Sequence, residues 1–343
     1  MDHLKFMIES HEAEAMAKKH GLKSVLHLLP LIVRSTRKLA RPPISGFSVS
    51  AAGLSSDGRI FIGVNVEFPG LPLHHSIHAE QFLITNLSRY PDTTLTNVVV
   101  SAYPCGHCRQ FLQEIRGAPD IQIYVLQDDD YDHDHDHDQL VKINGFFRPL
   151  SYFLPHRFGP DDLLEKDVPL ILETHENGLV LVDEFTKGQN GNLNLVANGF
   201  SSDVISAALE AANRSHAPYS GYPSGMALID DKGNVYKGSY MESAAYNPSL
   251  GPVQAAVIAY IAAARDGAEA EAEDGYGYGR IVGGVLVEKE GAAVRQEETV
   301  RLFLKTVMPN CAFHVYHCKD SSSPIKGESE SELKLELELE LEL

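Results

Sequence analysis

Two short motifs contain residue types that bind metals and transfer protons. The first, His78–Glu80, reads His-Ala-Glu, and the second, Pro104–Cys108, reads Pro-Cys-Gly-His-Cys. One imidazole and two thiolates are good zinc ligands, and three protein ligands leave one position of a tetrahedral site for water. Zinc lowers the pKa of such a water to roughly 7. The spacing therefore predicts a catalytic zinc site formed by His78, Cys105 and Cys108.

Glu80 stands two residues from His78, within reach of the same water without being a ligand. A carboxylate in that position can accept the proton of the water and return it to the substrate and the leaving group, so we expect Glu80 to be the general acid and base. A Cys-x-x-Cys pair by itself also fits a redox pair or half of a structural zinc knuckle. His74 or His75 as a fourth ligand stays open, and His107 is expected to point elsewhere.

A second cluster of possible ligands lies near the end of the chain, at Cys311, His314, His317 and Cys318. The segment 306–318 is expected to be a strand. Alternate residues of a strand point to opposite faces, so these four side chains could converge only at a sharp bend. A partly buried strand is the preferred interpretation.

The elements around the two motifs alternate between strand and helix, which predicts an α/β fold with a mixed sheet covered by helices. A helix is expected over residues 3–20. The further expected elements are strands at 49–52 and 59–66 joined by a turn at 56–58, a helix at 78–87, a strand at 97–101, a helix at 105–115 and a strand at 121–126.

The composition excludes several classes of protein. The chain has 343 residues, of which 43% are apolar, and this length suits two domains better than one. The net charge of −18 argues against a protein that grips the nucleic-acid backbone. Four cysteines are too few for a disulfide scaffold, and no stretch approaches the ~20 apolar residues of a membrane span. No signal peptide is visible, so a cytosolic protein is expected.

Most of the negative charge is concentrated in three segments. Residues 128–138, residues 269–274 and residues 320–343 together carry −17 of the −18. The first is expected to be a loop, with metal capture by His133, His135 and His137 as the alternative. The last alternates leucine with acidic residues, and we expect disorder there, with a strand paired to another molecule as the alternative.

The chain also contains an internal repeat. The segment that starts at Pro42 matches the segment that starts at Ala217 at a constant offset of 175 residues, which pairs Glu67 with Glu242. Two related domains are therefore expected.

The motifs, together with the blocks ARPPISGF, GVNVEF, HAEQ, PCGHCRQFLQE and LPHRFGPDDL in this order, resemble cytidine deaminases of the long, two-domain, homodimeric type of enteric bacteria and plants. The order H-x-E…P-C-x-x-C is also the known signature of zinc deaminases. The resemblance covers roughly residues 20–320. It implies the three-layer fold of that family, duplicated in one chain.

The resemblance also implies a set of substrate contacts. Asn65 and Glu67 match the pair that holds the ribose 3′-hydroxyl, and Phe47 matches the aromatic residue on which the base stacks. Ala79 is expected to contact the substrate as well. Phe158 matches a family position that reaches the active site of the other subunit of a homodimer.

The second copy departs from the family pattern. At the offset of 175, His78–Glu80 corresponds to Val253–Ala255, and an alignment through Arg295-Gln296 places Gly291 and Val294 where the cysteines stand. This copy is therefore expected to be catalytically silent, with one zinc per chain. The expected divisions are an N-terminal helix at 1–20, a catalytic domain at 21–165, a linker at 166–197, a degenerate domain at 198–319 and a tail at 320–343.

The resemblance implies zinc-dependent hydrolytic deamination of cytidine, and of deoxycytidine, in pyrimidine salvage. A nucleoside is the expected partner, with neither nucleic acid nor membrane. Two alternatives stay open, a deaminase of polynucleotides and a non-catalytic zinc-binding interaction protein. The acidic charge balance speaks against the first, and the presence of Glu80 speaks against the second.

Overall fold

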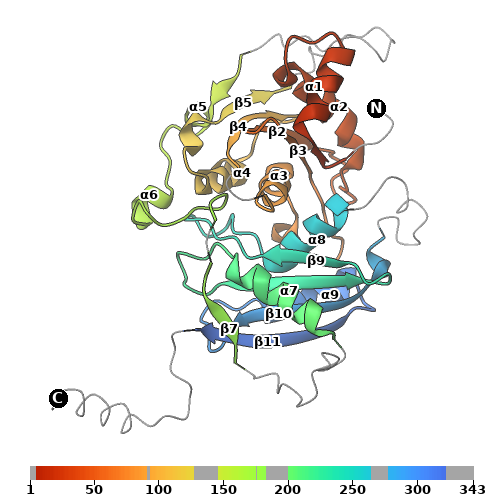
Figure 1. Ribbon diagram of the computed structural model, residues 1–343, viewed down its shortest axis with the longest axis vertical. Helices are drawn as coiled ribbons and strands as arrows, with labels where there is room; N and C mark the ends of the chain where they lie inside the picture. The colour runs from red at the N-terminus through yellow and green to blue at the C-terminus, as the bar shows by residue number, and fades with distance from the viewer. Residues whose placement is uncertain are drawn as a thin grey trace, which may run out of the picture.

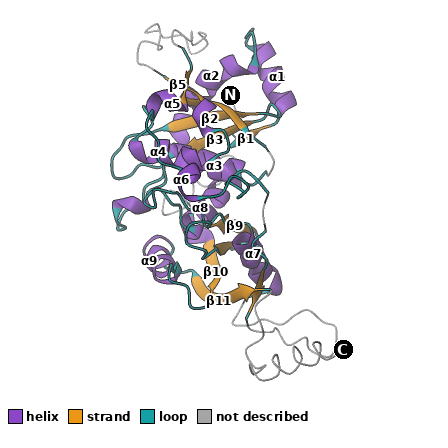
Figure 2. Ribbon diagram, turned by 90° about the vertical axis from the view of Figure 1, so that its left-hand side faces the viewer, coloured by secondary structure: helices purple, strands orange, loops and turns teal. Residues whose placement is uncertain are grey.

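The computed structural model describes residues 5–90, 93–126, 146–174, 176–182, 200–263 and 277–321. In these ranges the chain forms two mixed sheets, each covered by helices, and the two halves lie one above the other in Figure 1. Figure 2 shows the same division from the side. The predicted α/β fold with a mixed sheet in two copies is confirmed.

The first half is built on a six-stranded sheet with the order β1-β3-β2-β4-β5-β6. Only β4 and β5 run parallel, and the other neighbouring strands are antiparallel. The strands are β1 (Met7–Ile8), β2 (Ser50–Ser55), β3 (Ile60–Val64), β4 (Leu95–Val100), β5 (Gln122–Val125) and β6 (Arg148–Pro149).

The second half repeats this plan in a five-stranded sheet with the order β7-β11-β10-β8-β9. Its one parallel pair, β10 and β11, corresponds to β4 and β5. The strands are β7 (Leu179–Leu181), β8 (Ser224–Asp230), β9 (Val235–Ser239), β10 (Ile281–Lys289) and β11 (Ala312–Asp320). Strand β7 falls inside the segment 166–197 that was expected as a linker, and it pairs with β11.

The α-helices cover the faces of both sheets. In the first half they are α1 (Ser10–Lys19), α2 (Leu29–Thr36), α3 (Ala79–Leu87), α4 (Gly106–Phe111), α5 (Leu150–Phe153) and α6 (Pro160–Leu163). In the second half they are α7 (Ser202–Asn213), α8 (Pro252–Ala263) and α9 (Glu297–Val307).

A glycine sets the distance between α3 and the first sheet. A Cβ atom on Gly63 of β3 would lie 2.1 Å from the carbonyl oxygen of Ala79, so only glycine lets the helix lie this close. All residues of α3 are buried. In the second half, Gly238 of β9 has the same relation to α8, where a Cβ would lie 2.1 Å from the nitrogen of Ala256.

The predicted helix over residues 3–20 is wrong at its beginning. The helix starts at Ser10, and Met7 and Ile8 instead form β1, which pairs with β3. Phe6 is buried, and its ring stacks on Phe82 of α3 at 5.0 Å. Sheet hydrogen bonds and the buried ring stabilise the extended form of these residues.

One core cluster spans the two halves, and the second half has a further, separate cluster that includes Phe200 and Val285. Helix α3 packs against α8, its counterpart in the other half. A single cluster of buried apolar residues includes Phe82 of α3 and Val257 of α8. Among the described helices, none has the length and apolar character needed to cross a bilayer. The acidic segments 128–138 and 269–274, and the tail beyond Ser321, lie outside the described residues.

Candidate active site

The predicted zinc ligands meet at one point of the first half. His78 Nδ1 lies 3.4 Å from the sulfur of Cys105 and 3.4 Å from that of Cys108, and the two sulfurs are 3.6 Å apart. Among the described residues, these three form the group of histidine, cysteine and acidic side chains that could hold a metal ion.

The N-termini of helices α3 and α4 bring the three candidate ligands together. His78 is the N-cap of α3, and Cys105 is the N-cap of α4, so Cys108 follows on the first turn of α4. Each cap residue is extended while the residues after it are helical. The predicted helix over 105–115 is confirmed in its first part, and it tightens into a 3-10 turn at Leu112–Glu114.

The geometry of this group fits zinc. A tetrahedral ion with sulfur at about 2.3 Å and nitrogen at about 2.0 Å separates sulfur from nitrogen by about 3.5 Å and the two sulfurs by about 3.8 Å. The observed separations, 3.4 Å for each sulfur–nitrogen pair and 3.6 Å for the two sulfurs, lie within about 0.2 Å of these values. One imidazole and two thiols are also the donor set expected for zinc with an open fourth position.

The two thiols of the group differ in acidity. A hydrogen bond from Cys108 lowers the pKa of Cys105 to about 3, and the hydrogen bond from His78 acts in the same direction. The interaction with Cys105, followed by burial, raises the pKa of Cys108 well above its ordinary value. Binding of a metal as a bis-thiolate therefore has to release the Cys108 proton.

Glu80 lies beside the ligand group and is buried. Its Oε2 is 3.2 Å from the sulfur of Cys108. Burial is the largest cause that raises the pKa of Glu80 above its ordinary value. A buried carboxyl group next to the open position of a zinc site is suited to transfer protons.

The other candidate ligands are placed elsewhere. His107 is outside the ligand group, and its ring stacks on His78 at 4.7 Å. His75 is buried near Phe303, at 6.4 Å between ring centres. Neither belongs to the group that could hold a metal.

The second Cys/His cluster does not form a site in the part of the chain described here. The expected strand over 306–318 begins only at Ala312, because α9 continues to Val307. Cys311 precedes the strand, Cys318 is fully buried and His317 is exposed. These side chains therefore diverge, as alternation along a strand requires.

Asn65 and Glu67 both hold the loop that carries Phe47. Asn65 donates to the carbonyl oxygen of Phe47 at 2.9 Å and accepts from the nitrogen of Val49 at 2.8 Å. Glu67 accepts from the nitrogens of Ile44 and Ser45, each at 2.9 Å, and from the Ser45 hydroxyl at 2.6 Å.

Three donors on one carboxylate have an electrostatic consequence. Burial acts to raise the pKa of Glu67, but the hydrogen bonds from Ser45 and Ile44 outweigh it, and the pKa lies below its ordinary value. Glu67 is therefore an anion at neutral pH. The role of Ser45 was not predicted, although its recurrence as Ser220 in the repeat was a signal for it.

The remaining predicted contacts lie on the surface or at the helix start. Phe47 is 58% exposed and Phe158 is 45% exposed, so both rings are available to a ligand. Ala79 is buried as the first residue of α3. The side chain of Gln110, on α4, donates to the carbonyl oxygen of Phe158, which ties the loop of Phe158 to the helix of the cysteines.

The second half repeats the loop contacts, and its described residues include no group of histidine, cysteine and acidic side chains that could hold a metal ion. Glu242 accepts from the nitrogens of Tyr219 and Ser220 at 2.9 and 3.0 Å, and from the Ser220 hydroxyl, as Glu67 does in the first half. In the strand registers, Val99 pairs with Ala52 and Val285 pairs with Ala227. Ala227 is the counterpart of Ala52 at the offset of 175, so Val285 is the counterpart of Val99. Counting on from these two valines places Gly291 and Val294 at the positions of the two cysteines.

The alignment of the helix motif needs a correction. The isolated β-bridge between Val66 and Ile77 corresponds to the one between Met241 and Leu250 in the second half. The first residues of the two bridges are 175 positions apart, but the second residues are only 173 positions apart. The offset therefore falls from 175 to 173 before the helix. The contacts of Gly63 and Gly238 with their helices give the same value. His78–Glu80 therefore corresponds to Gly251–Val253, and not to Val253–Ala255. No residue of this corrected segment is a zinc ligand or an acid.

The second half also contacts the helix that begins at His78. Gln81 accepts from the nitrogen of His78 at 3.3 Å and donates to the carbonyl oxygen of Pro248 at 2.9 Å. Its position as the third residue of α3 in a capping arrangement was a readable signal.

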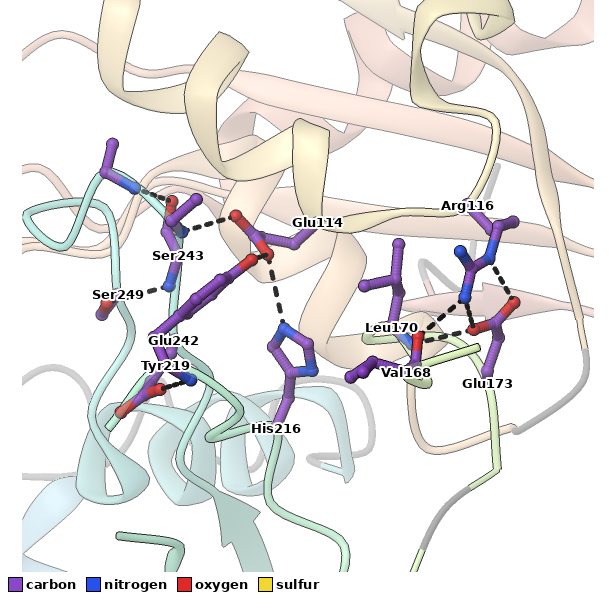
Figure 3. A network of polar contacts seen from close by, with 12 residues as sticks. Glu114, Arg116, Val168, Leu170, Glu173, His216, Tyr219, Glu242, Ser243 and Ser249 are labelled. Atoms are coloured by element: carbon purple, nitrogen blue, oxygen red, sulfur yellow. Dashed lines mark hydrogen bonds and ion pairs between the residues drawn. The ribbon is translucent and has the colours of Figure 1, made fainter. Parts of the chain in front are cut away.

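A second link joins the halves at Glu114, which has no exposed surface. Its carboxylate accepts from the Tyr219 hydroxyl at 2.6 Å and from the nitrogen of Ala244 at 2.7 Å, and it lies 3.4 Å from Nε2 of His216 (Figure 3). The three partners all belong to the second half. Nothing in the local sequence around Glu114 predicted this role.

Comparisons with known proteins agree with the geometry. Residues 26–125 and residues 150–301 match the family "Cytidine and deoxycytidylate deaminase zinc-binding region". Cytidine deaminase 1 of Arabidopsis thaliana is 54% identical, over 94% of this chain and 100% of its own length. Cytidine deaminase 7 of the same plant is 41% identical, over 92% of this chain and 95% of its own length.

A solved structure, the cytidine deaminase from Mycobacterium leprae, is 26% identical with a TM-score of 0.30 and covers 38% of this chain and 98% of its own. The full-length similarity to the plant proteins and the two matching domains establish the relationship. The chain therefore belongs to the cytidine deaminase family and is a hydrolytic cytidine deaminase.

Proposed function

We propose that the chain deaminates both cytidine and deoxycytidine at a single site in its first half, with one zinc ion per chain. The observation that carries this proposal is the position of Glu80 beside the group of His78, Cys105 and Cys108, with its carboxyl oxygen 3.2 Å from Cys108. The corresponding segment of the second half, Gly251–Val253, has no such side chains.

Zinc held by His78, Cys105 and Cys108 supplies Lewis acidity that activates water at neutral pH. Glu80 accepts a proton from the attacking water and delivers it to N3 of the cytosine ring. It then accepts the proton of the new hydroxyl on C4 and delivers it to the amine, which leaves C4 as ammonia. One water is consumed and one ammonia is released, while the ring amidine becomes a carbonyl. Burial excludes bulk water from Glu80, which strengthens its interaction with the reacting atoms.

The sugar end of the site lies at the loop anchored by Asn65 and Glu67. An anionic Glu67 accepts and the Asn65 amide both donates and accepts, which suits the 3′-hydroxyl of the sugar. The exposed ring of Phe47 offers a face on which the base stacks, and the buried Ala79 borders the base. No side chain is assigned to the 2′-hydroxyl, so both sugars are expected as substrates.

The proposed subunit arrangement rests on the family position that Phe158 matches, and the exposure of this residue agrees with it. Its ring is 45% exposed while its backbone is tied to α4, so it is available to a second copy of the chain. We propose a homodimer in which Phe158 completes the site of the partner. The four cysteines are unpaired, which agrees with a cytosolic enzyme of pyrimidine salvage. Light scattering is expected to give the mass of two chains.

The decisive experiment compares wild type with Glu80→Gln. The variant is expected to keep about one zinc per chain and to lose activity on cytidine and deoxycytidine by about 10²–10⁴-fold or more. Unchanged turnover with zinc retained would contradict the assigned role of Glu80. Turnover on single-stranded RNA but not on free nucleosides would instead favour a polynucleotide deaminase.

A further inference from the structure

A cavity of about 760 Å³ lies where the second half meets the end of α3. Every residue of β9 lines it, so it extends for about 13 Å along this strand. Helices α7 and α8 also contribute to its lining, and Thr85, Ser88 and Arg89 border it from the first half. The lining includes neither the ligand group around His78 nor Glu80, so the cavity is separate from the candidate active site.

Two alanines of α8 make room for this cavity. At the offset of 173 residues, Ala255 corresponds to Phe82 of α3. Ala259 corresponds in the same way to Asn86. In the first half, the ring of Phe82 stacks on Phe6 at 5.0 Å, and the amide of Asn86 donates to the carbonyl oxygen of Phe6 at 2.8 Å. Both alanines line the cavity, so methyl groups replace the larger side chains that fill the equivalent space of the first half.

Two tyrosine rings form part of the wall beside these alanines. Tyr236 of β9 and Tyr260 of α8 have ring centres 5.1 Å apart and planes at 86° to each other. The hydroxyl of Tyr236 donates to Asp230 at 2.8 Å, and that of Tyr260 donates to the carbonyl oxygen of Gly277 at 2.7 Å. Since both hydroxyls are bound within the protein, these residues offer ring surface to a ligand. Aromatic rings and small apolar side chains suit a flat ring.

The charge of the cavity lining is positive on balance, with five basic side chains and three acidic ones. One of the acids, Glu173, pairs with Arg116 at 2.8 Å, and Arg116 lies outside the lining. A second acid, Asp230, already accepts from the Tyr236 hydroxyl and from two nitrogens of Asn234. The basic residues are Arg89, Arg214, Lys232, Lys237 and Arg280. The lining therefore attracts an anion.

Two arginines gather at the end of the cavity that faces the first half. Arg214 stands two residues before His216, which forms a bridge with Met241. The hydroxyl of Thr85 lies 3.7 Å from the sulfur of the same methionine, and Arg89 follows four residues after Thr85. The loop around Met241 therefore brings the end of α3 close to the end of α7.

Lys237 joins these arginines through a shared acid. Glu210 lies 2.7 Å from Nζ of Lys237 and 3.8 Å from Nη1 of Arg214, so two cations share one anion. Among the described residues, no ion pair involves the side chain of Arg89. This end of the cavity therefore carries positive charge that an anionic ligand can pair with.

A flat apolar wall beside a group of cations matches the two parts of a nucleotide, its base and its phosphates. We propose that this cavity binds a nucleoside triphosphate, with the base against Tyr236 and the alanines of α8. The phosphates lie between Arg89, Arg214 and Lys237, because guanidinium groups donate paired hydrogen bonds to phosphate oxygens. The ligand contacts both halves, since Arg89 belongs to the first half and the other residues belong to the second.

Calorimetric titration of the full chain with UTP and with ATP tests the proposal. Uridine, the product of cytidine deamination, is present at saturation so that the catalytic site is occupied. At least one nucleotide is expected to bind saturably, at about one per chain, and to raise the melting temperature, because it binds only the folded protein. Absence of saturable binding for both nucleotides would overturn the proposal.

A pair of charge variants tests the phosphate end. Arg89→Gln is expected to weaken nucleotide binding about tenfold or more, because it removes a charged donor, while kcat for cytidine stays unchanged. Lys305→Gln removes the same charge from an exposed position of α9 outside the cavity, and it is expected to bind the nucleotide like wild type. Equal binding by the two variants would contradict the assigned phosphate contact.

A pair of ring variants tests the base end and distinguishes a nucleotide from a bare anion. Tyr236→Leu is expected to weaken nucleotide binding about tenfold, because stacking on the ring is lost, and to leave binding of inorganic tripolyphosphate unchanged. Tyr236→Phe keeps the ring and is expected to bind the nucleotide within about twofold of wild type. Tripolyphosphate that binds wild type as tightly as the nucleotide does would show an anion site without a base contact, and would overturn the proposal.

Discussion

The hydroxyl of Tyr219 donates a hydrogen bond of 2.6 Å to the carboxylate of Glu114, across the junction of the two halves. Glu114 stands six residues after the predicted zinc ligand Cys108, at the end of the same helical segment. A buried carboxylate is costly unless it is hydrogen-bonded, so the second half stabilises the segment that carries the cysteines. The second half thus contributes to the construction of the candidate site in the first half.

Tyr219→Phe is expected to lower the free energy of unfolding by about 1.5–3 kcal/mol, because it removes a hydrogen bond to a buried charged group. Burial, and then the bond to Glu114, raise the pKa of this tyrosine, so its hydroxyl remains the donor. Urea denaturation measures the change. Tyr222→Phe, at a partly buried hydroxyl nearby, is the control and is expected to stay within about 0.5 kcal/mol of wild type. Equal losses in both variants would show that the contact with Glu114 is unimportant.

Cys105→Ala is expected to reduce the zinc content from about one per chain to near zero, because two ligands do not hold the ion tightly. The melting temperature is expected to fall as well, because zinc binding couples to folding. Cys311→Ala removes a cysteine outside the site and is expected to keep zinc and activity. Metal analysis of the purified variants measures the zinc content, and an assay with cytidine measures the activity. Two zinc ions per wild-type chain, with one lost in Cys311→Ala, would revive the second Cys/His cluster.

Glu67→Gln and Glu242→Gln change the same contact in the two halves, since each carboxylate accepts from two backbone nitrogens and one serine. Glu67→Gln is expected to raise KM for cytidine about tenfold or more, because it removes the charge that holds the loop and meets the sugar. Glu242→Gln is expected to leave KM within about twofold. Steady-state kinetics decide, and similar KM values for both variants would refute the assignment of the sugar site to the first half.

Asp57, in the turn between β2 and β3, makes stability depend on pH. A hydrogen bond from Arg59 lowers its pKa to about 2, below the ordinary 3.8. A lowered pKa stabilises the folded state above about pH 4, and this contribution is lost as the pH falls toward about 2. The difference in unfolding free energy between wild type and Asp57→Asn is therefore expected to be constant above about pH 4 and to shrink below it. Arg59→Gln is expected to remove the same dependence. A difference that persists at about pH 2 would contradict the pairing.

The metal ligands could be predicted from the sequence because they lie in two contiguous stretches. His78 is the N-cap of α3, and Glu80 stands two residues later in the first turn of that helix. Cys105 is the N-cap of α4, and Cys108 follows it after one helical turn. The spacing within each stretch is a local property of the backbone. The offset of 175 was equally readable, and it agrees with the strand boundaries of β3 and β9.

Other features depend on contacts between distant segments. The offset drops to 173 between the bridge at Met241 and α8, and only the pairing of strands and helices shows where the two residues are missing. Likewise, residues 6–8 were expected to be helical, but β3 and Phe82 supply the contacts that make them extended.

The sequence by itself predicts the chemistry of this protein, namely zinc binding by His78, Cys105 and Cys108, proton transfer by Glu80 and a silent second half. The tertiary structure decided how that chemistry is supported. Glu114 meets His216 and Tyr219, 102 and 105 residues away, and Gln81 meets Pro248, 167 residues away. Local propensity carries no information about such partners, because the energy of burying a polar group depends on what the whole fold places beside it.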